Sequence, residues 1–207
     1  LPDGPVRAYA LFAHCFTCSK NFKAVSNISD TLSQLGVAVL SFDFTGLGKS
    51  EGDFGESGFS SNVSDLIMAS RFLEEHFEAP KLIIGHSLGG AAVIFAAAKL
   101  DCVKAVVTIG APSQPNHVKH LFSNDLERIK MEGKAEMNIG GRPFTLSKEF
   151  LKDLESQNLP ELLKGIGKAF LFMHSPQDSV VDISNAAELY QAAHHPKSFV
   201  SLDGSDH

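Results

Sequence analysis

One serine stands between glycines at the spacing that a sharp strand-to-helix turn requires. Residues 82–84 are apolar, a run of small residues begins at Ala91, and Gly-His-Ser-Leu-Gly-Gly lies between them at 85–90. A serine on such a turn has a strained backbone and an exposed hydroxyl, and a Cβ at Gly85 or Gly89 would collide with the strand or the helix. Ser87 is therefore a candidate nucleophile. The alternative is a glycine-rich helix start without chemistry.

An activated serine needs a general base within hydrogen-bond reach and an acid that orients this base. Ligands bind at the carboxyl ends of the strands of an open parallel sheet, so polar residues just past predicted strands are the candidates. After Ser87, the acids in such positions are Asp178 and Asp182, and His207 follows the last predicted strand. The order serine, acid, histidine is thus present, with helix capping as the other interpretation of Asp182.

The elements that would position these residues alternate between strand and helix. Short apolar runs predict buried strands, and apolar residues recurring every three or four positions predict helices. The alternation predicts an α/β fold, a doubly wound and mainly parallel sheet with helices on both faces. The predicted strands are residues 9–13, 37–42, 81–84, 103–109, 169–173 and 197–202, and the predicted helices are 22–35, 62–77, 91–100 and 183–193.

The alternation breaks at about residues 111–168, which we interpret as a small lid insertion. This segment contains two helical patches, a predicted hairpin around Gly140 and Gly141, and two short helices that begin near Ser147 and Pro160. The length of 207 residues fits a single domain, 1–207, with one full core.

Composition and charge exclude several classes of partner. The net charge is -6 and no Lys/Arg run occurs, so a nucleic-acid surface is not expected. No apolar run approaches the roughly 20 residues that span a bilayer, and the amino terminus lacks the features of a signal peptide. Three cysteines are too few for a disulfide framework, which favours a reducing cytoplasm. The histidines show no metal-ligand spacing, so neither a metal nor a cofactor is expected.

Several segments together resemble the α/β-hydrolase superfamily of esterases, lipases and acyl-peptide hydrolases. Residues 85–90 look like its nucleophile elbow, and residues 43–52 look like its Asp-x-Arg-Gly-x-Gly-x-Ser-x-Gly loop, with Thr45 replacing the arginine. Residues 178–181 and 206–207 resemble its acid and histidine loops. These segments follow the order of the family along nearly the whole chain, and the resemblance implies a serine hydrolase.

The resemblance also implies a role for each candidate residue. Ser87 would be the nucleophile, His207 the general base and Asp178 the orienting acid. The backbone N–H groups of Leu88 and Phe16 would form the oxyanion hole. The expected activity is hydrolysis of small or medium acyl esters or thioesters through an acyl-enzyme on Ser87.

Two cysteines close to this site leave a second interpretation open. Cys15 and Cys18 form a C-x-x-C pair at a predicted strand-to-helix junction, where a thiol pKa can be lowered, and Cys15 stands where relatives usually have glycine. The other interpretation is that both are small side chains lining the site. His14, just before them, is expected to hold this loop in place.

A narrower resemblance bears on the cysteines. Residues 13–20, 42–48 and 195–202 look like the hydrolase half of bacterial proteins that fuse an α/β-hydrolase to an OsmC-like peroxide-reducing domain. This resemblance implies that the first strands and last helix of such a hydrolase lie outside the chain, and that an OsmC-like domain is a partner. The alternative function is therefore a non-catalytic hydrolase-fold or thiol-redox accessory module that uses Cys15 and Cys18.

Apolar residues of the insertion are candidates for an acyl pocket. The expected lining combines aromatic insertion residues with residues beside the serine, and ordinary core packing is the alternative for each of them. The candidates are Phe16, Leu88, Phe122, Phe144 and Phe150.

Overall fold

Six strands form one parallel sheet in the order β2-β1-β3-β4-β7-β8. The structure is a computed structural model that describes residues 1–15, 20, 23–55, 57–139 and 142–207. The predicted α/β fold is confirmed, and the strands lie close to their expected positions. They are β1 (Ala8–Ala13), β2 (Val37–Ser41), β3 (Leu82–His86), β4 (Ala105–Ile109), β7 (Ala169–His174) and β8 (Lys197–Ser201).

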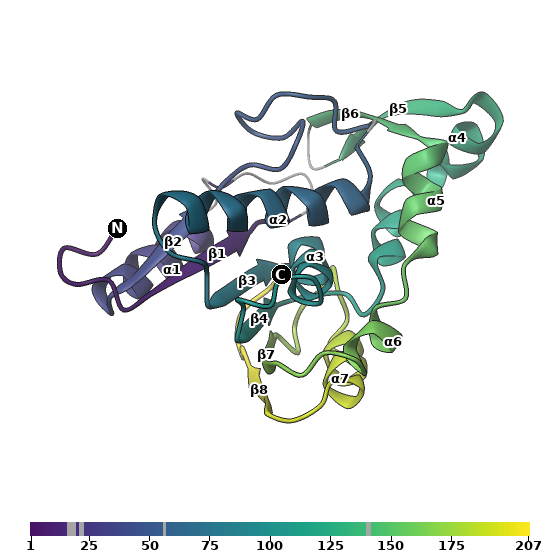
Figure 1. The fold of residues 1–207 in the computed structure, drawn as a ribbon. Coiled ribbons are helices and arrows are strands. Elements are labelled where there is room, and N and C mark those ends of the chain that lie inside the picture. The colour runs from purple at the N-terminus through teal and green to yellow at the C-terminus, as the bar shows by residue number, and fades with distance from the viewer. Residues whose placement is uncertain (16–19, 21–22, 56, 140–141) are drawn as a thin grey trace.

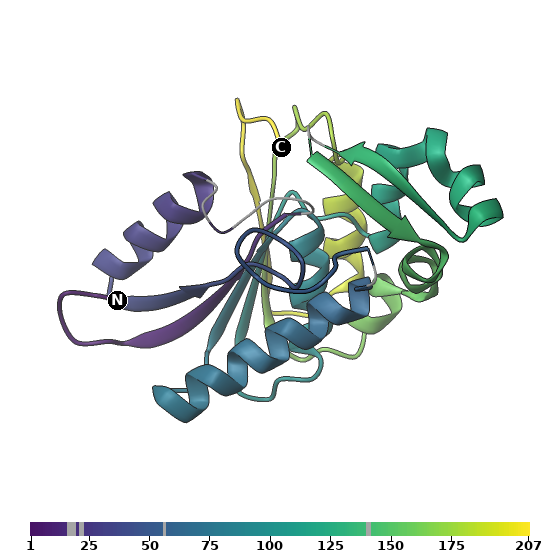
Figure 2. The same ribbon diagram turned by 90° about the horizontal axis from the view of Figure 1, so that it is seen from above.

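Helices cover both faces of this sheet (Figures 1 and 2). One face packs Phe12 and Ile84 against Val25 of the first helix, whereas Leu11 and Ile83 belong to the larger core on the opposite face. This division follows from the alternation of side chains along each strand. The first face carries α1 (Lys23–Gln34), and the second carries α2 (Phe59–His76), α3 (Leu88–Ala97) and α7 (Ser184–Ala192).

The glycine-rich loop after β2 is bound to α2 by Thr45. The backbone N–H and the hydroxyl of Thr45 donate to the carboxylate of Asp65, at 2.9 and 3.0 Å. The predicted start of this helix at residue 62 is wrong, because α2 begins at Phe59 with Gly58 at the N-cap. The carboxylate of Asp65 thus binds a loop that is distant in sequence.

Between β4 and β7 the chain leaves the sheet and forms the segment 111–168, called here the insertion. Ser147 accepts a hydrogen bond from the backbone N–H of Phe150 at 3.1 Å, so the predicted cap of the helix after the hairpin is confirmed. The Gly140-Gly141 turn lies outside the described residues. The elements are η1 (Pro115–Asp125), α4 (Leu126–Glu132), the antiparallel strands β5 (Lys134–Ile139) and β6 (Arg142–Ser147), α5 (Lys148–Ser156) and α6 (Leu159–Leu163).

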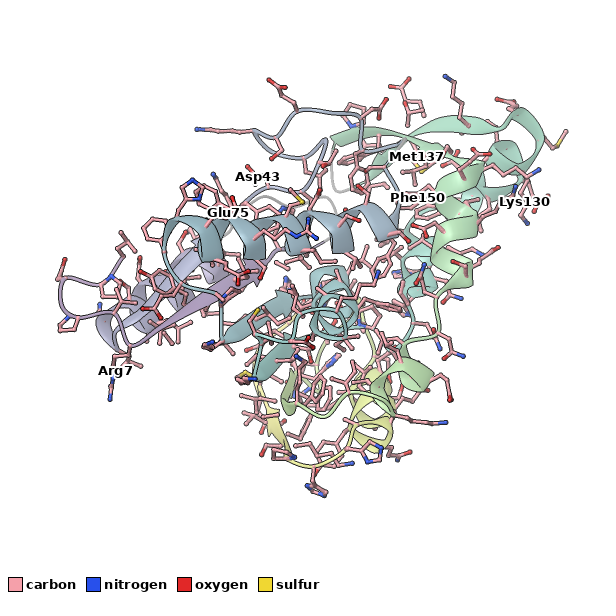
Figure 3. All side chains as sticks on the ribbon, viewed as in Figure 1. Arg7, Asp43, Glu75, Lys130, Met137 and Phe150 are labelled. Atoms are coloured by element: carbon pink, nitrogen blue, oxygen red, sulfur yellow. The ribbon has the colours of Figure 1, made fainter. Side chains whose placement is uncertain are left out.

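An aromatic cluster and a set of polar contacts, including one at Asp153, hold the insertion against the sheet-bearing part. Phe54 is 4% exposed, and its ring lies 5.6 Å from that of Phe144 and 5.7 Å from that of Phe150. Asp153 on α5 accepts from the backbone N–H and the hydroxyl of Ser60 at 2.7 and 2.6 Å. Ser60 lies in the first turn of α2, where the helix dipole favours a negative charge. Figure 3 shows Phe150 on the side of α5 that faces α2.

Within the part of the chain that the structure describes, no helix is long and apolar enough to cross a membrane.

Replacement of Phe54 by alanine should lower the free energy of unfolding by about 3–5 kcal/mol, because it opens a cavity between the insertion and the rest of the fold. Urea unfolding followed by circular dichroism measures this loss. Phe72→Ala is the matched control, since Phe72 is 45% exposed, and its loss should be much smaller. Equal losses in the two variants would contradict the packing role of Phe54.

Candidate active site

Ser87 joins β3 to α3 in a strained backbone conformation. Its φ is 54° and its ψ is -127°, and among the described residues no other non-glycine residue has a positive φ. Such a conformation costs on the order of 1–3 kcal/mol, so the surrounding structure must hold it. Part of that support is a hydrogen bond from the Ser87 N–H to the carbonyl oxygen of Ile109 at 2.9 Å, which ties the turn to β4.

The two glycines that flank the serine are required by close backbone approaches. A Cβ at Gly85 would lie 2.3 Å from the carbonyl oxygen of Gly89, and a Cβ at Gly89 would lie 2.3 Å from that of His14. Neither oxygen can move without displacing α3 or the end of β1. The predicted steric reason for both glycines is therefore confirmed.

His207 and Asp178 form a hydrogen-bonded pair. The Nδ1 atom of His207 lies 2.8 Å from Oδ2 of Asp178, whose side chain is 1% exposed. The other oxygen, Oδ1, accepts from the backbone N–H groups of Val180 and Val181 at 2.9 and 2.8 Å. Burial acts to raise the pKa of the Asp178 carboxyl, but the hydrogen bonds from Val181, His207 and Val180 outweigh it and hold this pKa below its usual value.

The two neighbouring acids have other partners. Asp182 accepts from the backbone N–H of Ser184 at 2.8 Å, one residue before Ile183, the N-cap of α7. Asp206 accepts from the backbone N–H and the hydroxyl of Ser179, at 3.3 and 3.0 Å. Asp206 thus binds the loop that carries Asp178 to the loop that carries His207.

Gly110 lies where the serine turn meets this histidine–carboxylate pair. It follows Ile109, the acceptor of the Ser87 N–H, and has a φ of 56°. A Cβ at Gly110 would lie 3.2 Å from Oδ2 of Asp178 and 3.4 Å from Nδ1 of His207. The sequence reasoning missed this residue, although a glycine directly after β4, at the carboxyl edge of the sheet, was a usable signal.

The ring of His86, the residue before Ser87, packs against the ring of His207. Its ring centroid lies 4.8 Å from that of His207, with 40° between the ring planes. The side chain is buried, and burial, followed by repulsion from His207, lowers the pKa of His86 to about 4. His86 is therefore neutral at neutral pH and presents an uncharged ring to His207.

The described residues include one of the two expected oxyanion donors. Leu88 is the first residue of α3, where a backbone N–H has no acceptor within the helix. Phe16, the other expected donor, lies outside the described residues, as does Cys18. Cys15 is 8% exposed and disulfide-bonded.

His14 holds the end of β1 against the glycine-rich loop, as expected from the sequence. Its Nδ1 donates to the carbonyl oxygen of Cys15 at 2.8 Å, and its Nε2 accepts from the N–H of Phe44 at 3.3 Å. These partners specify a neutral ring, and burial lowers the pKa of His14. Asp43 stabilises the same region by accepting from the backbone N–H groups of Lys20 and Lys49 at 2.7 and 3.0 Å.

Several residues expected as candidates for an acyl pocket belong to the hydrophobic core. Leu88 is 1% exposed, Phe122 and Phe150 are each 2% exposed, and Phe144 packs against the same core. Ordinary packing therefore accounts for these residues.

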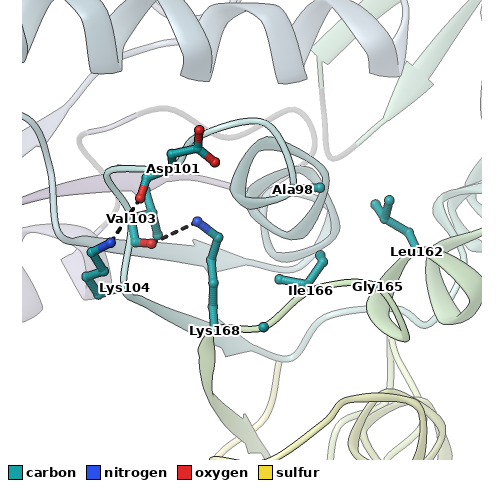
Figure 4. Close-up of a pocket in the computed structure, with 9 residues that line it drawn as sticks. Ala98, Asp101, Val103, Lys104, Leu162, Gly165, Ile166 and Lys168 are labelled. Carbon is teal, nitrogen blue, oxygen red and sulfur yellow. Dashed lines mark hydrogen bonds between the residues drawn. The ribbon is translucent and has the colours of Figure 1, made fainter.

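A cavity of about 500 Å³ lies at the opposite end of the sheet from Ser87, beside the residues that precede β4 and β7 (Figure 4). Lys168 at its edge donates from Nζ to the carbonyl oxygens of Leu100 and Val103 at 2.6 and 2.8 Å. Lys168 thus connects the residue before β7 to the loop before β4. No group of His, Cys, Asp and Glu among the described residues is arranged to hold a metal ion.

Comparison with known proteins gives a family match over most of the chain. The family model described as serine aminopeptidase, S33, matches residues 5–162. The esterase domain of a Rhodothermus marinus protein is 50% identical, with a TM-score of 0.77 over 100% of this chain and 81% of that one. Est1E from Butyrivibrio proteoclasticus, solved with ferulic acid, is 19% identical over 99% of this chain and 83% of that one, and its TM-score of 0.79 shows the shared fold.

A curated relative is a thioesterase. The mitochondrial palmitoyl-protein thioesterase ABHD10 of Rattus norvegicus is 28% identical over 143 residues, which are 69% of this chain and 45% of the relative. The chain thus spans about half the length of the curated relatives that it matches.

Gly110→Ala should destabilise the protein more than Gly133→Ala. Both glycines have positive φ, and alanine at such a position costs about 1 kcal/mol. At Gly110 the methyl group also crowds Asp178 and His207, whereas nothing lies within 4 Å of a Cβ at Gly133. Urea unfolding compares the stabilities, and the low-field proton resonance of the His207 Nδ1–H reports on the pair. An unchanged resonance and equal stabilities would refute the crowding.

His86 should make the fold less stable in mild acid. Its pKa is about 4 in the fold against 6.5 for an unperturbed histidine, so between these values only the unfolded chain binds the proton and stability rises with pH. Lowering the pH from 7 to 4 should therefore cost about 3 kcal/mol from this residue.

His86→Gln should remove this part of the pH dependence, and His76→Gln, at an exposed position, should retain it. Urea unfolding at pH 7, 5.5 and 4 measures the slopes. The assignment fails if His86→Gln keeps the slope of the unchanged protein.

Proposed function

The chain belongs to the α/β-hydrolase family described as serine aminopeptidase, S33; we propose that it is a hydrolase, which cleaves acyl esters or thioesters through an acyl-enzyme on Ser87. The observation that carries this proposal is the meeting of a strained serine turn with a hydrogen-bonded histidine–carboxylate pair around Gly110. A serine hydroxyl, a base and an orienting acid are the groups that acyl transfer requires.

In the first half of the proposed reaction, the Ser87 hydroxyl oxygen attacks the acyl carbonyl carbon and Nε2 of His207 accepts the hydroxyl proton. Asp178 accepts from Nδ1 of His207, which leaves Nε2 as the basic atom and stabilises the imidazolium as it forms. His207 then gives the proton to the departing alkoxide or thiolate, and the acyl group remains on Ser87.

In the second half, water attacks the acyl carbon and His207 accepts a proton from this water. The carboxylic acid leaves as the proton returns to the oxygen of Ser87. In both halves the negative charge on the tetrahedral oxygen is stabilised by the Leu88 N–H at the start of α3, and by the Phe16 N–H as the second proposed donor.

The class of substrate is supported by two relatives. The 50%-identical structure is an esterase domain, and the curated relative is a palmitoyl-protein thioesterase. Attack on an acyl carbon that bears oxygen or sulfur needs the same protein groups, so we assign this chain small or medium acyl esters or thioesters. We further propose that residues 1–207 form one domain in which the insertion, 111–168, acts as a lid. A cytoplasmic location and an OsmC-like partner domain stay predictions from the sequence.

The alternative of a thiol-redox accessory module rests on one observation, the disulfide bond of Cys15. It differs from the proposed function in its reactive atom, which would be sulfur. A fluorophosphonate probe attached to Ser87 supports the hydrolase. A chain that remains unlabelled and whose Cys15 exchanges rapidly with glutathione supports the redox module.

Ser87→Ala should lower kcat for p-nitrophenyl butyrate on the order of a million-fold, because serine and histidine act as one unit in acyl transfer. Ser64→Ala, at an exposed serine of α2, is the control and should retain activity and labelling. Steady-state kinetics and mass spectrometry of the labelled peptide give the two readouts. Unchanged hydrolysis by the Ser87→Ala protein would refute the proposed function.

A further inference from the structure

His174, the last residue of β7, reaches the loop that carries Asp178. Its side chain is 1% exposed, and its Nε2 lies 2.8 Å from the carbonyl oxygen of Val181 and 3.4 Å from Oδ2 of Asp178. The loop turns back on itself, because the Asp178 N–H donates to the carbonyl oxygen of Ser175 at 3.3 Å. Residues that are four and seven positions after His174 are thereby brought onto one edge of its ring.

The partner of Nε2 fixes the tautomer of His174. A carbonyl oxygen can only accept, so the hydrogen bond to Val181 requires a hydrogen on Nε2. This N–H also presents its positive end to Oδ2 of Asp178. The contact at 3.4 Å is longer than the bond to Val181, so its effect on the carboxylate is electrostatic.

Oδ2 of Asp178 therefore lies between two histidines. Nδ1 of His207 donates to it at 2.8 Å, and the His174 N–H approaches it at 3.4 Å, while the loop backbone occupies Oδ1. Rotation of the carboxylate would disrupt all of these contacts together. The side chain of Asp178 is 1% exposed, so water gives little compensation for a lost donor.

We propose that His174 is a positioning residue for the hydrolytic site: its Nε2–H fixes the acid loop through Val181 and directs Oδ2 of Asp178 toward His207. This inference rests on the proposed function. His174 does not touch substrate or the reacting atoms and acts through Asp178. It adds a third histidine to a site for which the sequence order had indicated one.

Other ionisable groups also act on this position. Asp178 is the nearest, Asp182 lies at the start of α7, and His86 belongs to the serine turn. Asp178 is the one of these whose carboxylate faces Nε2 within 4 Å. A change at His174 should therefore be detected mainly at the Asp178–His207 pair.

His174→Leu removes the N–H and is the first test. Loss of an outer partner of an active-site ligand, as measured in metal sites, costs about 10- to 100-fold in activity, and kcat should fall by that factor while KM changes little. Without the nearby N–H the Asp178 carboxylate is a stronger acceptor, so the pH of half-maximal kcat/KM should move upward. The low-field His207 Nδ1–H resonance should shift as well.

His174→Gln and His174→Asn separate positioning from general packing. The amide nitrogen of glutamine can replace Nε2 and should restore most of the lost kcat and the original pH profile. Asparagine is polar but one methylene shorter, and should behave like leucine. Should the leucine variant fail to fold, the comparison of these two variants remains decisive.

His117→Leu is the matched control, because His117 on η1 contacts the same loop. His117 bonds through Nε2 to the carbonyl oxygen of Val180 at 3.0 Å, one residue from the acceptor of His174. Loosening of the loop alone would affect both variants equally, whereas positioning of Asp178 requires the pH shift in His174→Leu and not in His117→Leu.

The inference is overturned if His174→Leu keeps the kcat and pH profile of the unchanged protein, or if His117→Leu reproduces its effects. It is also overturned if glutamine does not restore activity in a folded protein. Failure of the proposed function looks different, because Ser87→Ala would then retain hydrolysis. The His207 resonance would still report whether His174 orients the pair.

Discussion

The left-handed backbone of Ser87 is the constraint on which the carboxyl edge of the sheet depends. A conformation that L-residues rarely adopt persists here because the Ser87 N–H is bonded to Ile109, and because Gly85 and Gly89 let α3 approach β3 and β1. The bond to Ile109 also fixes the residue that follows, Gly110. The geometry of the nucleophile and the space left for the acid–base pair are thus set by the same stretch of backbone.

The histidines of this region differ in the partners of their ring nitrogens. His14 donates to one carbonyl and accepts from one N–H, His174 donates to a carbonyl beside a carboxylate, and His207 donates to that carboxylate. His86 is kept neutral by burial against His207. One side-chain type therefore serves four purposes, and the partners that decide among them include residues far away in sequence, such as Phe44 for His14 and Asp178 for His207.

The dependence of many contacts on the folded chain explains which features could be predicted from the sequence. The strands and most helices follow from local periodicity, and the steric need for Gly85 and Gly89 follows from one motif. The role of Asp65 does not, because its carboxylate is bound by Thr45, 20 positions away. Gly110 likewise gains its contacts only when β4, the loop after β7 and the end of the chain become neighbours. The contacts of His174 lie within its own loop and depend on how this loop turns back, which no periodic pattern records.

The insertion leaves the sheet between β4 and β7, and this position limits how its sequence can vary. β4 and β7 are adjacent strands in parallel register, so the sheet closes identically whatever chain connects them. The hairpin of β5 and β6 pairs only within the insertion among the described residues. An exchange of the whole segment would have to preserve or replace its contacts with Phe54, Ser60, Val180 and Asn185. Because Val180 also donates to the carboxylate of Asp178, a change of the insertion at His117 reaches the candidate acid of the site.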